Sequence, residues 1–303
     1  MNSGVASASI ESAYAACEHF AGRDKPHLYA AAQHFGWPQT RRAFAATYAS
    51  MRLIDDFVDG IPGRAHLNDR TRATATSRID EWWDSVRKAK SGMAVADPVW
   101  EALSDTFARF ELPLEPWDDL ARAMRSDLST PIFRDWEHLR AYMAGASVAP
   151  AVVFMHLVLM RPADDRFRSP WPYDKVVAAT EDLAIFCYWV HILRDVAADL
   201  ASPDRGLLYL PEKDLRDFGL DVADLYRMRD EGHASDGYLR LAQFEAERAR
   251  THLDRGRGHL RHVLAAAPPA GARALTELVD TYVAVLQGLA QRQFDVFKTA
   301  SPH

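Results

Sequence analysis

Four polar side chains share one face of a predicted helix in the first part of the chain. Tyr48, Arg52, Asp55 and Asp59 follow one another at spacings of four, three and four residues within YASMRLIDDFVDG. Because residues three or four apart lie on the same side of an α-helix, they are predicted to form one stripe. Carboxylates one turn apart repel each other unless a cation lies between them. The stripe is therefore either a solvated acidic face or part of a cation site.

A second stripe of the same kind lies far along the chain. Tyr188, His191, Asp195 and Asp199 follow at spacings of three, four and four residues within CYWVHILRDVAADL. Apolar residues surround both aspartate pairs, so we expect both helices to be largely enclosed in the protein. Buried carboxylates have to be paired or to bind a metal. The apolar surroundings therefore favour a cation site over a solvated face.

The residue types in the two stripes predict chemistry on a diphosphate. Aspartate oxygens suit Mg²⁺, which takes one or two carboxylates and completes its coordination with water and phosphate oxygens. The predicted Mg²⁺ ligands are Asp55, Asp59, Asp195 and Asp199. Arg52 and Arg194 are predicted to neutralise phosphate oxygens with their guanidinium groups. Loss of diphosphate from an allylic carbon would then yield a carbocation, which requires a dry pocket lined by aromatic rings.

Helices must position these side chains, because helical periodicity dominates the chain and no run of alternating β-branched residues is bounded by hairpin turns. The predicted helices cover residues 9–21, 38–60, 69–91, 97–110, 115–128, 135–161 with an interruption near Pro150, 173–201, 237–266 and 271–298. Pro and Gly separate them. No Pro/Gly-rich spacer is long enough to mark a domain boundary. We therefore predict one all-α domain over residues 1–303.

Composition excludes several kinds of partner. The chain has 303 residues, 48% of them hydrophobic, and a formal net charge of −6. A chain with this negative net charge lacks the basic character of proteins that bind nucleic acid or membrane surfaces. We expect no signal peptide, because the first twenty residues lack a positively charged region ahead of an apolar core. We expect no transmembrane segment, because the longest apolar run, Ala149 to Met160, is too short for a membrane span. Cys17 and Cys187 match no zinc or disulfide pattern, which favours a reducing, cytoplasmic location.

The two stripes resemble the aspartate motifs of the squalene/phytoene synthase family. YASMRLIDDFVD is similar to the family's first motif and HILRDVAAD to its second, and the similarity continues in AMRSDL at 123–128 and YLPEKDLRDFGL at 209–220. Such co-linear agreement is more specific than a single aspartate motif. The resemblance implies an all-α isoprenoid-synthase helical bundle with a central substrate cavity. It also implies that the four aspartates bind Mg²⁺ and that Tyr48, Arg52, Tyr142 and Arg194 contact the diphosphate or the reacting carbons.

Three further substrate contacts follow from the resemblance. The N-terminal diphosphate segment, which is rich in serine in the family, corresponds here to DKPHLY at 24–29 and leaves Lys25 as its phosphate ligand. The loop that leads to Tyr209 is longer than in the family, so Arg205 is placed only loosely within it. Lys25, Arg205 and Tyr209 are expected to bind substrate.

Other positions depart from the family pattern. Tyr188 and His191 replace the Gln and Asn that usually begin the second motif, and Ile132-Phe133 replaces the Arg-Tyr pair that follows the AMRSDL segment. Pro150 stands where glycine would let a second long prenyl chain pass. Lost polar ligands and added bulk indicate that one diphosphate is bound and that the second substrate is of another kind.

These departures favour a Mg²⁺-dependent prenyltransferase that ionises a dimethylallyl-type diphosphate and transfers the prenyl group to an indole-type or carbazole-type aromatic acceptor, as some squalene-synthase-like bacterial enzymes do. His191 would accept the proton that the ring loses, and Tyr188 and Tyr142 are the other catalytic candidates. A core histidine hydrogen-bonded to Tyr188 or to a backbone carbonyl is the structural alternative.

The alternative function is head-to-head condensation of two prenyl diphosphates, as in squalene, presqualene, hydroxysqualene or phytoene synthases. A terpene cyclase is disfavoured, because its second metal motif would normally mix Asn, Ser and Glu, whereas this chain has Asp195 and Asp199. A helical scaffold without activity would not need all four aspartates.

Two other features receive structural interpretations. The Arg/His-rich stretch at 248–262 is predicted to be a solvated helix face, and His138 and His156 are predicted to be histidines with satisfied hydrogen bonds.

Overall fold

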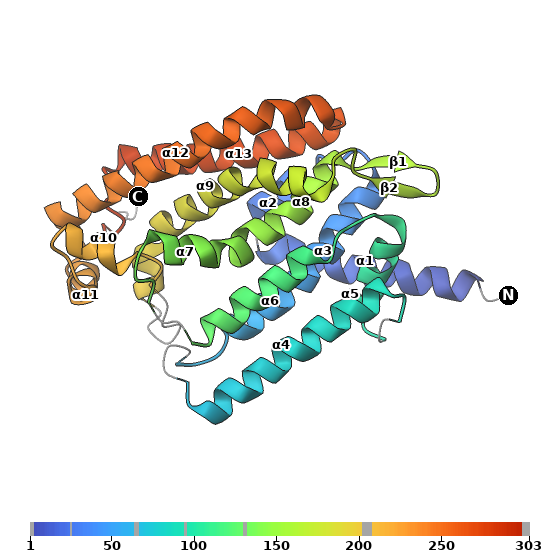
Figure 1. Ribbon diagram of the computed structural model, residues 1–303, viewed down its shortest axis with the longest axis horizontal. Helices are drawn as coiled ribbons and strands as arrows, with labels where there is room; N and C mark the ends of the chain where they lie inside the picture. The colour runs from blue at the N-terminus through green and yellow to red at the C-terminus, as the bar shows by residue number, and fades with distance from the viewer. Residues whose placement is uncertain are drawn as a thin grey trace, which may run out of the picture.

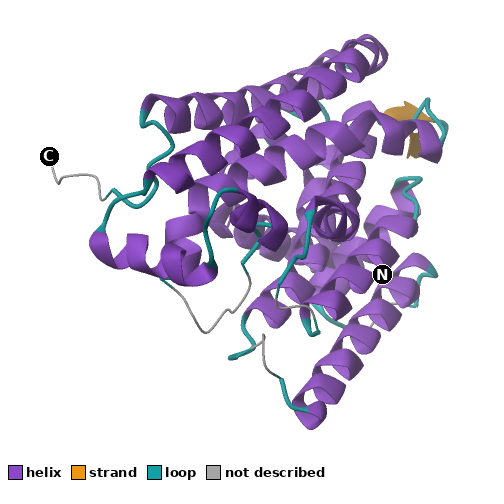
Figure 2. Cartoon of the chain, turned by 60° about the vertical axis from the view of Figure 1, so that its left-hand side comes forward, coloured by secondary structure: helices purple, strands orange, loops and turns teal. Residues whose placement is uncertain are grey.

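The computed structural model describes residues 3–24, 26–63, 67–93, 96–129, 132–201 and 208–298. Within these ranges the chain is helical almost throughout, and one short hairpin is the exception (Figure 2). The helices are α1 (Ser3–Asp24), α2 (Pro26–Ala32), α3 (Pro38–Asp59), α4 (Asp69–Lys90), α5 (Pro98–Arg109), α6 (Glu115–Asp127), α7 (Trp136–Met143), α8 (Ala149–Leu159), α9 (Tyr173–Leu200), α10 (Glu212–Asp217), α11 (Val222–Glu231), α12 (Asp236–Ala266) and α13 (Pro269–Gln291). Strands β1 (Arg161–Ala163) and β2 (Arg166–Arg168) pair antiparallel. The all-α prediction is confirmed.

The predicted helix bounds hold best for the long helices. α3, α4, α9 and α12 each begin and end within one residue of the prediction. The short helices α2, α10 and α11 were not predicted, because segments of this length show too little periodicity. The expected interruption near Pro150 is a π-helical segment, η2 (Ala144–Val148), directly before α8. α13 ends earlier than predicted, since Gln293 and Phe294 adopt positive φ angles of 54° and 62°.

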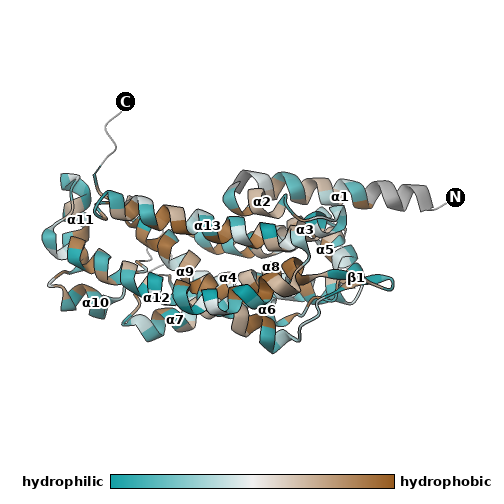
Figure 3. Ribbon diagram, turned by 90° about the horizontal axis from the view of Figure 1, so that it is seen from above, coloured by the Kyte–Doolittle hydropathy of each residue, from teal (hydrophilic) through white to brown (hydrophobic). Residues whose placement is uncertain are grey.

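α9 is the central helix of the bundle. It packs against α12, α8 and α13, which lie beside it in Figure 1. Figure 3 shows apolar residues gathered along α8 and α9, the two helices that supply much of the core. Gly256 lets α12 approach α9 closely, since a Cβ atom there would lie 2.6 Å from Leu183 Cδ2. The second predicted stripe is thus carried by a helix that neighbours hold on several sides.

Two helical stretches have the length and composition of a membrane span, namely Trp136–Leu159 and Tyr173–Leu200. Of their most apolar windows, 72% and 61% respectively are buried inside the fold. Central helices of a helical bundle have the same apolar character because they are covered by other helices. The two stretches therefore match core helices, and the absence of a membrane span stays a prediction.

His156 on α8 is buried without a hydrogen-bond partner among the described residues. Its side chain is 4% exposed and neither ring nitrogen is bonded, so the prediction of a satisfied histidine is wrong here. The ring stacks on Tyr173, with ring centroids 6.2 Å apart. Burial lowers the pKa of His156 to about 4, which keeps the ring neutral. His138, in contrast, accepts a hydrogen bond at Nδ1 from the backbone N–H of Arg134.

We expect His156→Leu to leave the free energy of unfolding unchanged or to raise it, because an apolar side chain of similar size removes two unsatisfied polar atoms. His156→Ala should lower it by about 2–5 kcal/mol, because it leaves a cavity in the core. Urea unfolding followed by circular dichroism measures both values. A loss in the leucine variant as large as in the alanine variant would contradict this view, since the ring nitrogens would then stabilise the fold.

The prediction of a solvated helix face at 248–262 is wrong for the first residues of this stretch. The Arg248 side chain is 17% exposed, and its Nη1 donates to Asp214 Oδ2 of α10 at 2.8 Å and to Glu245 Oε2 at 2.5 Å. Glu245 is fully buried. The Nδ1 atom of buried His252 lies 2.6 Å from a carboxylate oxygen of α9. Residues three and four apart share a helix face, so these side chains face the core while their neighbours remain exposed.

Glu245 should make the stability of the fold depend on pH. Burial raises its pKa from 4.5 to about 8, against the opposing effect of Arg248. A group with a raised pKa in the folded state stabilises the fold below its ordinary pKa, and this contribution is lost as the pH rises towards 8. Between pH 4.5 and 8, the free energy of unfolding of the wild type should fall relative to Glu245→Gln, by at most about 1.4 kcal/mol per pH unit. Urea titrations across this range measure it, and parallel pH profiles for the two proteins would contradict it.

Candidate active site

Several helix ends meet at one end of the bundle, on the left in Figure 1. They are the C-terminal ends of α3, α6 and α9 and the starts of α7 and α10. Ile132 and Leu208 form a β-bridge there, and the Glu212 amide donates to the Phe133 carbonyl at 2.8 Å. The segment before α7 is thereby joined to the segment before α10. This end of the bundle holds most of the predicted site residues that the structure describes.

α3 presents the first stripe. The Arg52 guanidinium donates to Asp55 and pairs with Asp56 on the next turn. The Arg52 side chain is 19% exposed and Asp59 is half-buried. Tyr48 lies further back on the same helix and is also half-buried. The carboxylate charge of this stripe is therefore offset by a guanidinium from the same helix.

α9 presents the second stripe, in which one guanidinium binds two predicted site residues. Arg194 donates from Nε and Nη2 to both oxygens of Asp195, at 2.6 and 2.7 Å. This hydrogen bonding raises the pKa of Arg194. Nη2 of Arg194 also lies 2.8 Å from His191 Nδ1. Because a guanidinium has donors only, Nδ1 of His191 is the acceptor of this hydrogen bond.

Neither aspartate pair is as enclosed as expected. The side chains of Asp55 and Asp195 are 33% and 27% exposed, and Asp199 is exposed. The apolar neighbours Ile54 and Val196 are buried, each at 2% exposure. A helix with one apolar and one polar side explains the difference, because apolar neighbours in sequence turn into the core while the carboxylates face outward. The carboxylates are therefore accessible to a hydrated ion and a charged substrate.

Four aromatic side chains lie together beside the stripes, and we call them the tyrosine cluster: Phe133, Tyr142, Tyr188 and Tyr209. Ring centroids are 5.0 Å apart for Phe133 and Tyr142, and 5.8 Å apart for Phe133 and Tyr209. The ring centroid of Tyr209 lies 6.0 Å from that of Tyr142 and 6.2 Å from that of Tyr188. The Tyr142 hydroxyl donates to Asp127 Oδ2 at 3.1 Å. The cluster forms an aromatic wall with hydroxyl groups at its edge.

Electrostatic effects keep the phenols of the cluster protonated. Burial raises the pKa of Tyr142 and Tyr188 well above the usual value of 10, and neighbouring tyrosines and the Asp127 carboxylate add to the shift. The Asp55 carboxylate also raises the pKa of Tyr188. Asp55 lies on α3 and Tyr188 on α9, and the C-terminal ends of these two helices lie at the same end of the bundle (Figure 1).

The carboxylates fit a metal that uses few protein ligands. Within the described ranges, no three His, Cys, Asp or Glu side chains are close enough to hold a metal ion by themselves. Mg²⁺ commonly binds one or two carboxylates and takes its other ligands from water and substrate phosphate. Two separate aspartate pairs of hard oxygen donors match that requirement. Asp55 and Asp59 would hold such ions on α3, and Asp195 and Asp199 on α9.

The structure thus brings together most of the predicted site residues that it describes, and Tyr48 lies further back on α3. The three predicted tyrosines of the cluster, His191, both arginines and the aspartates lie at the same end of the bundle. Lys25 and Arg205 lie outside the residues that the structure describes.

Three contacts were not predicted from sequence. Asp127 accepts the hydrogen bond of Tyr142, and its AMRSDL segment was the signal that could have found it. Asp56 pairs with Arg52. Tyr282 of α13 lies near the second stripe, where burial raises its pKa to about 12, Asp195 adds to the shift and Arg194 opposes it. No motif surrounds Tyr282, so only the packing of α13 beside α9 reveals it.

Comparisons with known proteins show the family of the chain. The family model described as Squalene/phytoene synthase matches residues 23–303. The 15-cis-phytoene synthase of Synechococcus elongatus is 29% identical over 299 residues, which cover 96% of this chain and 88% of the relative. Phytoene synthase 2 of Solanum lycopersicum is 30% identical over 217 residues, 72% of this chain and 63% of that protein.

Solved structures share the fold. The squalene synthase HpnC from Alicyclobacillus acidocaldarius superposes with a TM-score of 0.71 at 24% identity, covering 94% of this chain and 95% of that chain. A dehydrosqualene synthase superposes with a TM-score of 0.75 at 20% identity, covering 97% and 92%. Because the family match spans nearly the whole sequence, the chain belongs to the squalene/phytoene synthase family and is a prenyltransferase.

Proposed function

We propose that the enzyme condenses two prenyl diphosphates head to head, giving a product of the squalene or phytoene type. The observation that carries the proposal is that two aspartate–arginine stripes, on the C-terminal parts of α3 and α9, lie at the same end of the bundle (Figure 1). Similarity to a phytoene synthase over 96% of the chain supports the same class of reaction. This replaces the aromatic acceptor as the first choice of second substrate.

The chain's own groups fit the departure of diphosphate. Mg²⁺ held by the aspartates would neutralise phosphate oxygens and so make diphosphate a better leaving group. The guanidinium groups of Arg52 and Arg194 would donate to those oxygens. The allylic carbon–oxygen bond then breaks, with both electrons leaving on the diphosphate. A double bond of the second substrate supplies the electron pair for the new carbon–carbon bond, and loss of a proton gives a cyclopropyl diphosphate. Loss of its diphosphate and of a second proton gives a hydrocarbon of the phytoene type, whereas a squalene-type product also needs a hydride donor.

The tyrosine cluster suits the carbocation that forms in this step. Its ring faces attract positive charge through their quadrupoles. Protonated phenols are weak nucleophiles, and the raised pKa of Tyr142 and Tyr188 keeps them in that form. Asp127 holds the Tyr142 hydroxyl and thereby the direction of its ring. Phe133 and Tyr142 are buried, which favours exclusion of water that would capture the cation.

His191 is a proton acceptor only when Arg194 has another partner. The Nδ1 lone pair of His191 accepts from Arg194, so the same lone pair is not available for a proton. A bound diphosphate offers Arg194 stronger charge-assisted hydrogen bonds. Arrival of the substrate would therefore draw Arg194 away and expose the basic nitrogen, which links proton removal to an occupied site.

Transfer to an aromatic acceptor is the second candidate. It is favoured by Ile132 and Phe133, which stand where the family usually has an arginine and a tyrosine. Ile132 is 41% exposed, and Phe133 is fully buried in the tyrosine cluster. An apolar side chain at Ile132 offers no donor to a second diphosphate. A flat, electron-rich ring would pack against such a surface.

Product analysis separates the two candidates. The purified chain with Mg²⁺ is incubated with dimethylallyl, geranyl, farnesyl or geranylgeranyl diphosphate, each alone and each with indole or carbazole. We expect an extractable hydrocarbon, or a cyclopropyl diphosphate, from a single prenyl diphosphate without any acceptor. Products that form only when the aromatic compound is present would overturn the head-to-head proposal in favour of the second candidate. Absence of any coupled product would contradict both.

A further inference from the structure

One arginine of α12 contacts α7, which carries a member of the tyrosine cluster, and α10, which directly follows another. Arg248 donates to Asp214 of α10 at 2.8 Å. Its guanidinium carbon also lies 4.3 Å from the ring centroid of Trp136, the first residue of α7. α7 carries Tyr142, and the segment that leads into α10 carries Tyr209. A single planar group therefore lies between the two chain segments that bring these tyrosines to the site.

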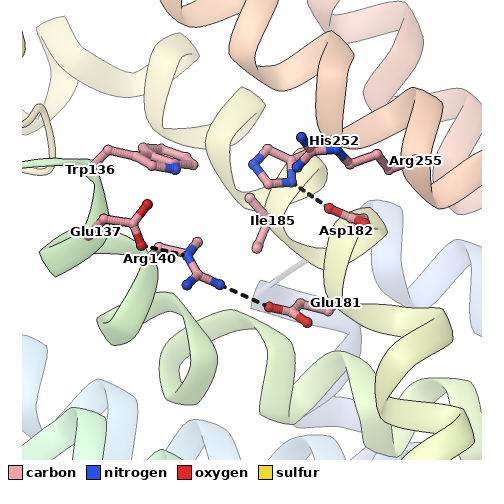
Figure 4. A pocket seen from close by; sticks show the side chains of 8 residues that line it. All are labelled: Trp136, Glu137, Arg140, Glu181, Asp182, Ile185, His252 and Arg255. Carbon is pink, nitrogen blue, oxygen red and sulfur yellow. Dashed lines mark hydrogen bonds and ion pairs between the residues drawn. The ribbon is translucent and has the colours of Figure 1, made fainter.

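The same turn of α12 also holds α9, which carries Tyr188. The indole Nε1 of Trp189, the next residue along the chain, donates to the backbone carbonyl of Glu245 at 3.2 Å. Trp189 and Trp136 pack edge to face with centroids 5.1 Å apart. Figure 4 shows Trp136 of α7 on the cleft that His252 of α12 also lines. α7, α9 and α10 are thus all fixed to one part of α12.

The link from Asp214 to Tyr209 is short and continuous. Besides the Glu212 hydrogen bond described above, the Lys213 amide donates to the Arg134 carbonyl at 2.9 Å. Leu210 and Asp214 are buried at 2% and 6% exposure. A segment held in this way cannot shift at one end without shifting at the other, so the position of Asp214 determines the position of Tyr209.

We propose that Arg248 is a positioning residue for prenyl transfer, which sets the spacing of the tyrosine cluster by holding α7 and α10 together. The inference rests on the proposed role of the cluster beside the carbocation. Arginine suits both contacts, because its guanidinium forks onto a carboxylate and lies flat on an indole ring, whereas lysine is a point charge on a flexible stem. Arg248 touches no reacting atom and acts through the rings that do.

Kinetics of two variants and a matched control test the proposal. Arg248→Met removes the hydrogen bonds to Asp214 and Glu245 and the contact with the Trp136 ring. Arg248→Lys keeps only the charge. Arg250→Met is the control, since Arg250 is 43% exposed on the same helix and pairs with Glu247. We expect kcat to fall about 100-fold in Arg248→Met, as small misplacements at a reacting centre do, with KM for the allylic diphosphate nearly unchanged. The control should match the wild type. A rise in KM with kcat unchanged would overturn the proposal.

A double-mutant cycle separates positioning from general stability. If Arg248 acts through the cluster, Arg248→Lys should cost much less in Tyr209→Leu than in the wild type. If Arg248→Lys instead lowers kcat by the same factor in Tyr209→Leu as in the wild type, Arg248 acts independently of Tyr209. That result would overturn the proposal. The lysine variant keeps a charge beside Asp214, so this cycle holds even where the methionine variant fails to fold.

Hydrogen exchange provides a test that needs no activity. In Arg248→Lys we expect faster amide exchange in residues 208–216 and 132–143, with the remaining helices unchanged. Unchanged exchange in both segments would overturn the positioning role, whatever the enzyme makes. Failure of the wild type to form any product, with exchange altered as expected, would instead contradict only the proposed function.

Discussion

Asp55→Asn and Asp195→Asn should each lower kcat by about 10³-fold, the size expected when a group that stabilises developing charge is removed from a site. Asparagine keeps the shape of the side chain and removes the charge. Each variant takes one carboxylate from a pair, and no group of three His, Cys, Asp or Glu side chains among the described residues could hold the ion by itself. The loss should appear in the rate of diphosphate release at saturating Mg²⁺ and substrate.

A matched control shows whether the loss is local. Asp118→Asn also removes a carboxylate that pairs with an arginine on its own helix, but it lies on α6, where the side chain is 42% exposed. This variant should retain the wild-type kcat. Circular dichroism should show the same helical content in all three variants. Activity of Asp55→Asn or Asp195→Asn close to that of the Asp118→Asn control would mean that the stripes do not act on the diphosphate.

Arg194→Gln is the second substitution with a large expected effect. We expect kcat to fall about 10²-fold, because a guanidinium that meets the leaving diphosphate contributes charge-assisted hydrogen bonds in the transition state. The loss has a second source, since Arg194 also binds His191 and Asp195. Steady-state kinetics with varied allylic diphosphate measure it.

Arg122→Gln is the control for this prediction. Arg122 is 63% exposed and pairs with Asp118 and Asp119 on α6. The Arg122→Gln substitution should therefore leave kcat and KM at their wild-type values. If Arg194→Gln changed KM alone, Arg194 would bind substrate and transition state equally well and would not assist departure of the diphosphate.

Local helix geometry explains why the two stripes were predictable. Asp55 and Asp59, or Asp195 and Asp199, share a face of one helix whatever surrounds that helix. The bounds of α3 and α9 followed from the same periodicity. Proximity of the two helices was implied only by the resemblance to a family, because no local pattern shows which helices meet.

Side-chain exposure and tertiary contacts could not be predicted from the sequence. The half-exposed side chain of Asp195 depends on which neighbours cover it, and apolar residues beside it in sequence turned to another side. Arg248 stands in a stretch of alternating charges that is typical of a solvated helix, yet it packs between Asp214 and Trp136. His156 was expected to have a partner and has none within the described ranges. These outcomes arise from packing between distant segments.

The measurement that tests the central claim most directly is release of diphosphate from an isotopically labelled allylic prenyl diphosphate. The wild-type chain is compared with the Asp55→Asn/Asp195→Asn double variant, each with Mg²⁺ and each with excess EDTA. We expect release by the wild type with Mg²⁺, matched by a carbon-coupled product, and neither release nor product in the other three reactions. Release at the wild-type rate by the double variant, or by the wild type in EDTA, would contradict the assignment of diphosphate departure to the two aspartate stripes.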